Sequence, residues 1–123
     1  MPGADKCVRD RTCVEHILRY CEQVRGSLAE IQHDRDRFLA SHTYQNAISM
    51  CILQIGELVK RLSDDFLQEY TYIPWSLIAK TRDNYAHHYG TVDFEMVWTT
   101  AVDDLPAVEA FCRKYLEENA PEE

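Results

Sequence analysis

Apolar residues along the chain recur at intervals of three and four, the spacing of an amphipathic helix. One apolar face begins near Arg9 and runs into the thirties. A second follows Ser41 or Thr43, and either hydroxyl can cap a helix N-terminus. The pattern therefore predicts two long helices. Their apolar positions are Val14, Ile17, Leu18, Cys21, Val24, Leu28 and Ile31, then Tyr44, Ala47, Ile48, Cys51, Ile52, Ile55, Leu58, Val59 and Leu62.

The second half of the chain has shorter periodic segments. Residues 63–74 break the pattern, and Pro74 suits the first turn of a new helix, where the missing N–H is not needed. We expect this third helix to run from about Pro74 to Tyr89 and to stop at Gly90.

A fourth helix can be capped by Asp93, and Pro106 is expected to kink or break it before the chain continues to Glu118. Four main helices plus a kinked or short C-terminal helix, joined by brief connections, favour an all-α, antiparallel up-and-down bundle. Gly56 interrupts the second apolar face and should let a neighbouring helix approach closely. We expect one domain over residues 1–123, with 1–8 and 119–123 as flexible tails.

Composition excludes several classes of protein. The chain is 46% apolar and 28% charged, which is typical of a soluble globule, and no apolar run approaches the ~18 residues of a membrane span. The N-terminus lacks the charged and apolar regions of a signal peptide, so the cytoplasm is the expected location. Five cysteines without a C-x-x-C argue against a disulfide framework or a zinc site. Four of them fall in apolar patterns and are expected in the core: Cys13, Cys21, Cys51 and Cys112.

Side chains that can bind or exchange protons with a phosphodiester are concentrated in residues 82–89, with the sequence Arg-Asp-Asn-Tyr-Ala-His-His-Tyr. RNA cleavage without a metal needs a base for the 2′-hydroxyl, an acid for the leaving oxygen and positive charge for the transition state. An imidazole such as that of His87 can serve in either proton-transfer role, and Arg82 can grip two phosphate oxygens. Asp83, one turn before His87, could orient its ring. The same spacing also fits a surface Asp83–His87 pair with Arg82 bracing the helix end.

Helical geometry places these groups unequally. Arg82, Tyr85 and Tyr89 share one face, whereas His87 lies about 140° around the axis from Arg82. A two-fold pairing of identical helices would let the two faces meet. The formal charge of −8 is unusual for a protein that binds nucleic acid, although four basic residues flank the cluster: Lys60, Arg61, Lys80 and Arg82.

Arg82 to Tyr89 resembles the R-x4-H-x-Y motif of the HEPN superfamily, specifically the HepT-like toxin ribonucleases. The likeness extends over roughly residues 10–116 through landmarks in the same order, namely Ile55-Gly56-Glu57, Ile73-Pro74-Trp75, Val92-Asp93, Val97-Trp98 and Asp104-Leu105-Pro106. The resemblance implies a helical bundle that forms a homodimer, with both motif copies lining a shared cleft. It also implies ribonuclease activity without metal or other cofactor.

The resemblance further implies roles for single residues. Arg82 and His87 would be the catalytic pair. Tyr89 would be the tyrosine to which a minimal nucleotidyltransferase antitoxin of the MntA type attaches AMP, and the added negative charge would repel RNA. Asp83 stands where relatives often have asparagine and places an anion beside the phosphate. The residue types themselves, apart from the resemblance, suit supporting or substrate-binding roles for Asp83, Asn84, Tyr85 and His88.

One alternative function stays open from the sequence. The acidic net charge also suits a non-catalytic module that complexes with a nucleotidyltransferase-like protein. In that case residues 82–89 would form an interface or a nucleotide pocket rather than a catalytic site.

Overall fold

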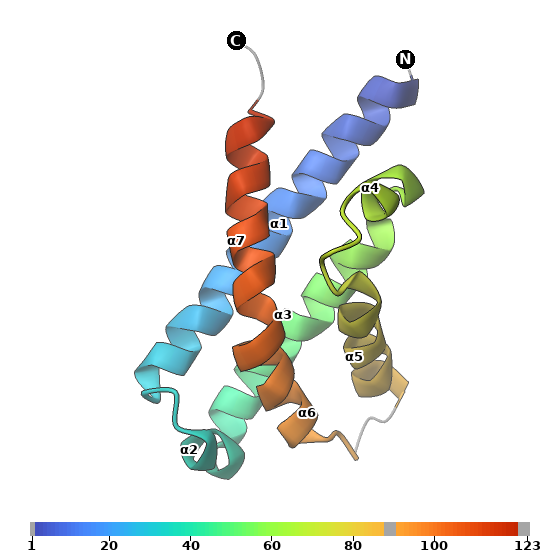
Figure 1. Ribbon diagram of the computed structural model, residues 1–123. Helices are drawn as coiled ribbons and strands as arrows, with labels where there is room; N and C mark the ends of the chain where they lie inside the picture. The colour runs from blue at the N-terminus through green and yellow to red at the C-terminus, as the bar shows by residue number, and fades with distance from the viewer. Residues whose placement is uncertain (1, 88–90, 121–123) are drawn as a thin grey trace.

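The computed structural model describes residues 2–87 and 91–120, and within these the side chains of 6–84, 87 and 91–120. This part of the chain is all helical, without a strand, which confirms the expected fold class. The four main helices alternate in direction along the chain (Figure 1): α1 (Pro2–Glu30), α3 (His42–Arg61), α5 (Trp75–His87) and α7 (Leu105–Glu118). Between them lie α2 (Arg35–Ala40), α4 (Asp64–Glu69), α6 (Phe94–Thr99) and a π-helical segment, η1 (Thr100–Asp104).

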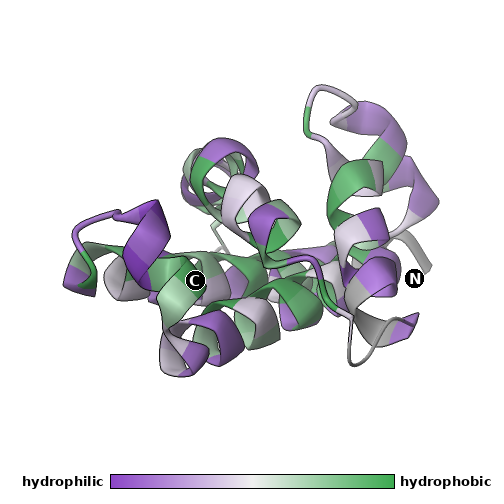
Figure 2. Ribbon diagram, turned by 90° about the horizontal axis from the view of Figure 1, so that it is seen from below, coloured by the Kyte–Doolittle hydropathy of each residue, from purple (hydrophilic) through white to green (hydrophobic). Residues whose placement is uncertain are grey.

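The core lies between α1 and α3, which pack on each other, with α7 against α1 and α5 against α3. Figure 2 shows hydrophobic residues where the helices face one another and hydrophilic residues on their outer sides. The four cysteines expected in the core are buried, and Cys7 is exposed. None of the described helices has both the length and the apolar character needed to cross a membrane.

The first helix starts earlier than its apolar pattern indicates. α1 begins at Pro2 rather than near Arg9. Its early residues from Lys6 to Arg9 are exposed, so they carry no apolar face for the sequence to display. Amphipathic periodicity reports burial rather than helix alone, and the expected start was therefore wrong.

Two short helices were missed in the sequence because each depends on caps instead of periodicity. In α2, the Asp34 carboxylate accepts hydrogen bonds from the N–H groups of Asp36 and Arg37, at 2.9 and 3.2 Å. In α4, the Ser63 hydroxyl accepts a bond from the Phe66 N–H at 3.2 Å. Buried Asp10 on α1 in turn accepts bonds from the Ser63 N–H and hydroxyl, at 2.8 and 2.6 Å. α4 is thus fixed to α1 by a contact between residues distant in sequence.

The expected caps of the longer elements are confirmed, and of the kink or break expected at Pro106 the break does not occur. Ser41 caps α3 and Asp93 caps α6 through their side-chain oxygens. From Phe94 the chain then stays helical to Glu118 through η1. Proline lacks an N–H and its ring crowds the carbonyl four residues earlier. The wider π turns, in which the Leu105 N–H reaches the Thr100 carbonyl, come just before Pro106 and accommodate it.

Candidate active site at the end of helix α5

Arg82 is positioned by the close packing of α5 on α3. A Cβ built on Gly56 of α3 would lie 2.2 Å from Cβ of Arg82 and 2.6 Å from its Cγ. No side chain fits at that distance, so glycine is what lets the two helices meet here. This confirms the expectation that Gly56 admits a neighbouring helix, and it identifies the Arg82 side chain as the group admitted.

The Arg82 guanidinium is held by two carboxylates. It forms an ion pair with Glu57 of α3, and its Nη1 donates to Asp83 at 3.0 Å. Its side chain is 22% exposed, and its buried Nε has no hydrogen-bond partner among the residues that the structure describes. Arginine has five N–H donors. The two ion pairs therefore fix the guanidinium while leaving donors uncommitted.

Asp83 connects α5 to α3 through Lys60. Its carboxylate accepts hydrogen bonds from Lys60 and from Arg82, and these bonds hold the pKa of Asp83 below its ordinary value. The carboxylate is therefore charged at neutral pH. Together, the linked side chains of Lys60, Arg82, Asp83 and Glu57 carry two positive and two negative charges. The hypothesis that Asp83 orients the imidazole of His87 gains no support, since the described side chains show no bond between the two.

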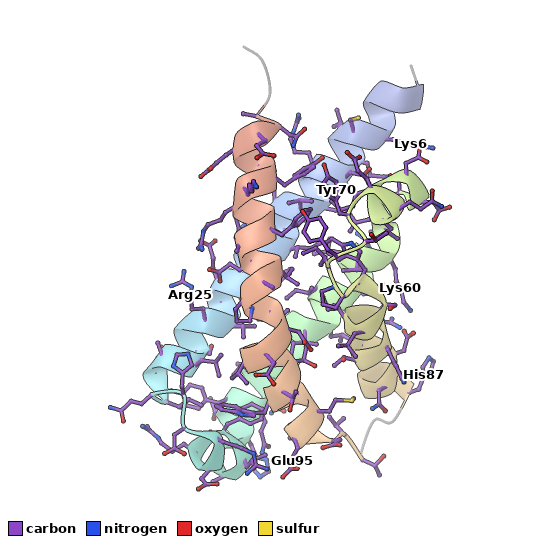
Figure 3. All side chains as sticks on the ribbon, viewed as in Figure 1. Lys6, Arg25, Lys60, Tyr70, His87 and Glu95 are labelled. Carbon is purple, nitrogen blue, oxygen red and sulfur yellow. The ribbon has the colours of Figure 1, made fainter. Side chains whose placement is uncertain are left out.

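His87 lies exposed at the last described turn of α5 (Figure 3). The helix keeps its geometry through His87, so this side chain and Arg82 leave the axis on different sides. Leu77, Lys80, Asn84 and His87 follow one another at three- and four-residue intervals along the outer side of α5. Leu77 is 45% exposed there, and the Asn84 amide contacts the sulfur of Met96 on α6 at 3.6 Å.

Part of the 82–89 cluster lies outside the described residues. The predictions for His88 and Tyr89, and the helix stop at Gly90, lie outside the described residues. The same holds for the side chain of Tyr85. Within what is described, the structure places Arg82 and Asp83 together beside α3, whereas Asn84 lies beside α6 on the side of α5 that carries His87.

Two residues of α3 gain a definite relation to the site. Glu57 stood in the sequence only within the landmark Ile55-Gly56-Glu57, and in the structure it forms an ion pair with Arg82. Lys60 was noted only as one basic residue near the cluster, whereas it binds Asp83 directly. No periodic or motif signal links Lys60 to Asp83, because their contact depends on how α3 packs on α5. The described side chains hold no group of three or more His, Cys, Asp or Glu arranged to bind a metal ion.

Comparison with known proteins gives a family match over most of the chain. The model of the family described as Ribonuclease HepT-like matches residues 17–115. A protein of Caldanaerobacter subterraneus subsp. tengcongensis named "Putative RNase" is 29% identical over 107 residues, 87% of this chain and 94% of that protein. A "Putative RNase" of Methanocaldococcus jannaschii is 35% identical over 71 residues, 58% of this chain and 59% of that protein. A "Probable ribonuclease HepT" of Thermococcus cleftensis is 33% identical over 72 residues, 58% of this chain and 66% of that protein. No solved structure gives a significant match.

Proposed function

This chain belongs to the HepT-like ribonuclease family, and from that premise we propose that it is an endoribonuclease that cleaves RNA without a metal ion, using Arg82 and His87. The observation that carries the proposal is that the side chain of Arg82 is already held in position. Its guanidinium is fixed beside α3 by Glu57 and Asp83, with further N–H donors not bound by any described side chain, on the helix that also carries exposed His87. A transition state with growing negative charge is stabilised best by a cation that is already in place.

The reaction needs two proton transfers. One imidazole takes the proton of the ribose 2′-hydroxyl, and the 2′-oxygen then forms a bond to phosphorus. The bond from phosphorus to the 5′-oxygen breaks, and that oxygen receives a proton from a second group, which acts as the acid. Arg82 holds the non-bridging oxygens of the phosphorane-like transition state. The products are a 2′,3′-cyclic phosphate and a free 5′-hydroxyl.

A homodimer is part of the proposal because Arg82 and His87 leave α5 on different sides. Two copies related by a two-fold axis would bring Arg82 of one protomer toward His87 of its partner. The outer side of α5 that carries His87 also carries exposed Leu77, an apolar group suited to such a contact. Each pair of Arg82 from one protomer and His87 from its partner would then form one site, in which His87 carries out one of the two proton transfers.

The direct test is cleavage of a single-stranded RNA by the purified protein in the presence of EDTA. We expect cleavage to continue, with cyclic phosphate at one new end and hydroxyl at the other, as resolved by mass spectrometry of the fragments. Cleavage that appears only after magnesium is added would contradict the metal-free mechanism. A chain that never cleaves RNA but forms a tight complex with a nucleotidyltransferase would favour the alternative of a binding module.

Control of the enzyme is the second part of the proposal. We infer that a minimal nucleotidyltransferase antitoxin transfers AMP from ATP to the hydroxyl oxygen of Tyr89, with release of pyrophosphate and the hydroxyl proton. The attached AMP places a bulky anion two residues from His87 and repels RNA. Incubation with that partner and ATP should raise the intact mass by one AMP or a whole multiple of it. A Tyr89→Phe chain should gain none. The same mass gain in that variant would assign the modification elsewhere.

A further inference from the structure

Two stripes of side chains face each other along the groove between α1 and α3, next to the site. Members of each stripe are three or four residues apart, which puts them on one side of their helix. The stripes meet because α1 and α3 pack directly on each other. The α1 stripe is Arg9, Cys13, His16 and Tyr20, and the α3 stripe is Gln54, Glu57 and Arg61.

The first of two hollows in this groove has a volume of about 440 Å³ and is basic. Four cationic side chains line it, together with the carboxylate of Asp64: Lys6, Arg9, Lys60 and Arg61. Lys6 and Lys60 each already bind a carboxylate. Arg9 and Arg61 form no ion pair with any side chain that the structure describes. Two exposed guanidiniums that have no ion-pair partner among the described side chains thus line one hollow, where they can bind an anion.

The charges of Arg9 and Arg61 both act on the same buried residue, Cys13. Burial, followed by the charge of Asp10, raises the pKa of the Cys13 thiol, and the cations of Arg61 and Arg9 both oppose that rise. Both guanidiniums are therefore near the Cys13 sulfur, although one comes from each helix. The two guanidiniums therefore place their positive charges in one region of the groove.

The second hollow, about 230 Å³, connects this basic region to the site. Its lining includes Arg61, which also lines the first hollow, and Glu57, which holds Arg82. Glu57 and Arg61 are one helical turn apart, a rise of about 6 Å. His16 and Tyr20 lie half-buried in its α1 wall. Cations at one end and flat rings along the wall match the phosphates and bases of a single strand.

We propose that the groove between α1 and α3 binds the single-stranded RNA that leads away from the phosphate being cleaved. Arg9 and Arg61 hold backbone phosphates, and Tyr20 offers a face on which a base stacks. The inference rests on the proposed ribonuclease function and names the part of the substrate beyond the reacting bond. Glu57 does not repel the strand, because Arg82 neutralises it.

The test measures binding of a fluorescent 2′-O-methyl RNA strand, which lacks the hydroxyl needed for cleavage, by fluorescence anisotropy. An Arg9→Gln/Arg61→Gln chain should bind about tenfold more weakly near 0.15 M salt, and the slope of log K against log salt should fall by about 1.4. An Arg9→Lys/Arg61→Lys chain should keep most of the slope. The matched control, Arg37→Gln/Lys114→Gln, removes the same charge from exposed positions on α2 and α7 and should bind within about twofold of wild type.

Equal binding by the glutamine variant and the control would overturn the proposal. The proposal would also be overturned if the glutamine variant bound a protein partner more weakly but bound RNA as tightly as wild type. Cleavage of unmodified RNA is measured in its own assay, so that failure of the ribonuclease function can be distinguished from failure of the groove assignment. A wild-type chain that binds through Arg9 and Arg61 but never cleaves would refute the ribonuclease function and leave the groove assignment standing.

Discussion

Replacing His87 by alanine is expected to lower the rate of RNA cleavage by about 10²–10⁴-fold, because a positioned acid or base contributes that much to proton transfer. Replacing Arg82 by alanine should lower it by about 10²–10³-fold through loss of charge stabilisation in the transition state. The measurement is the single-turnover cleavage rate of a labelled RNA. His42→Ala is the control, since His42 is exposed at the start of α3, and it should cleave at the wild-type rate.

Mixing the two inactive chains tests whether a site takes its residues from two protomers. If Arg82 of one copy acts with His87 of the other, a mixed dimer contains one complete site, and random mixing should recover about a quarter of the wild-type rate. Mixtures that stay inactive, although the chains exchange between dimers, would show that each site needs both residues from the same copy or all four at once. Wild-type cleavage by both single variants would refute the assignment of Arg82 and His87.

Gly56→Ala is expected to lower the free energy of unfolding by about 1–3 kcal/mol, because the added Cβ overlaps the Arg82 side chain and forces α5 away from α3. Chemical denaturation measures this directly. Cleavage should fall as well, since the displacement moves Arg82 itself. We expect the loss in kcat to exceed any rise in KM, because the guanidinium acts mainly in the transition state.

Gly26→Ala is the matched control for this variant. Gly26 also lies in a long helix, but a Cβ there would meet nothing within 4 Å. Alanine should therefore stabilise the protein by about 0.5–1 kcal/mol through its better helix propensity, with cleavage unchanged. If Gly56→Ala behaved like Gly26→Ala, the close approach of α5 to Gly56 would not be what positions Arg82.

The main helices could be predicted because their signals are local. The apolar spacing of α3 and the caps at Ser41 and Asp93 are all present within a few consecutive residues. α4 could not be predicted in this way, since its cap depends on Asp10, which is 53 residues from Ser63. The π-helical segment before Pro106 was also missed, because sequence periodicity shows that proline disturbs a helix but not where the backbone absorbs the disturbance.

The residues of the candidate site were proposed from the sequence, whereas their contacts could not be. The residue types of Arg82 and His87 indicated acid–base chemistry, and Gly56 indicated a close helix approach. The contact of Lys60 with Asp83 joins residues 23 apart and follows only once α3 and α5 are packed. Tertiary packing therefore gave Asp83 a different partner from the neighbouring imidazole that helical spacing offered.

The ion pairs of Arg82 with Glu57 and Asp83 have a consequence for how long RNA stays bound. A phosphate that binds the remaining donors of this guanidinium meets two carboxylates of the protein beside it, and their negative charge opposes binding, so the substrate gains little affinity in its ground state. The same holds for the cleaved strand, which carries similar charge. Weak binding of the substrate and the product in their ground states does not by itself slow turnover. Rapid release of product at this position is thus the expected kinetic effect of the two ion pairs, and it would let one enzyme molecule cut many strands in succession.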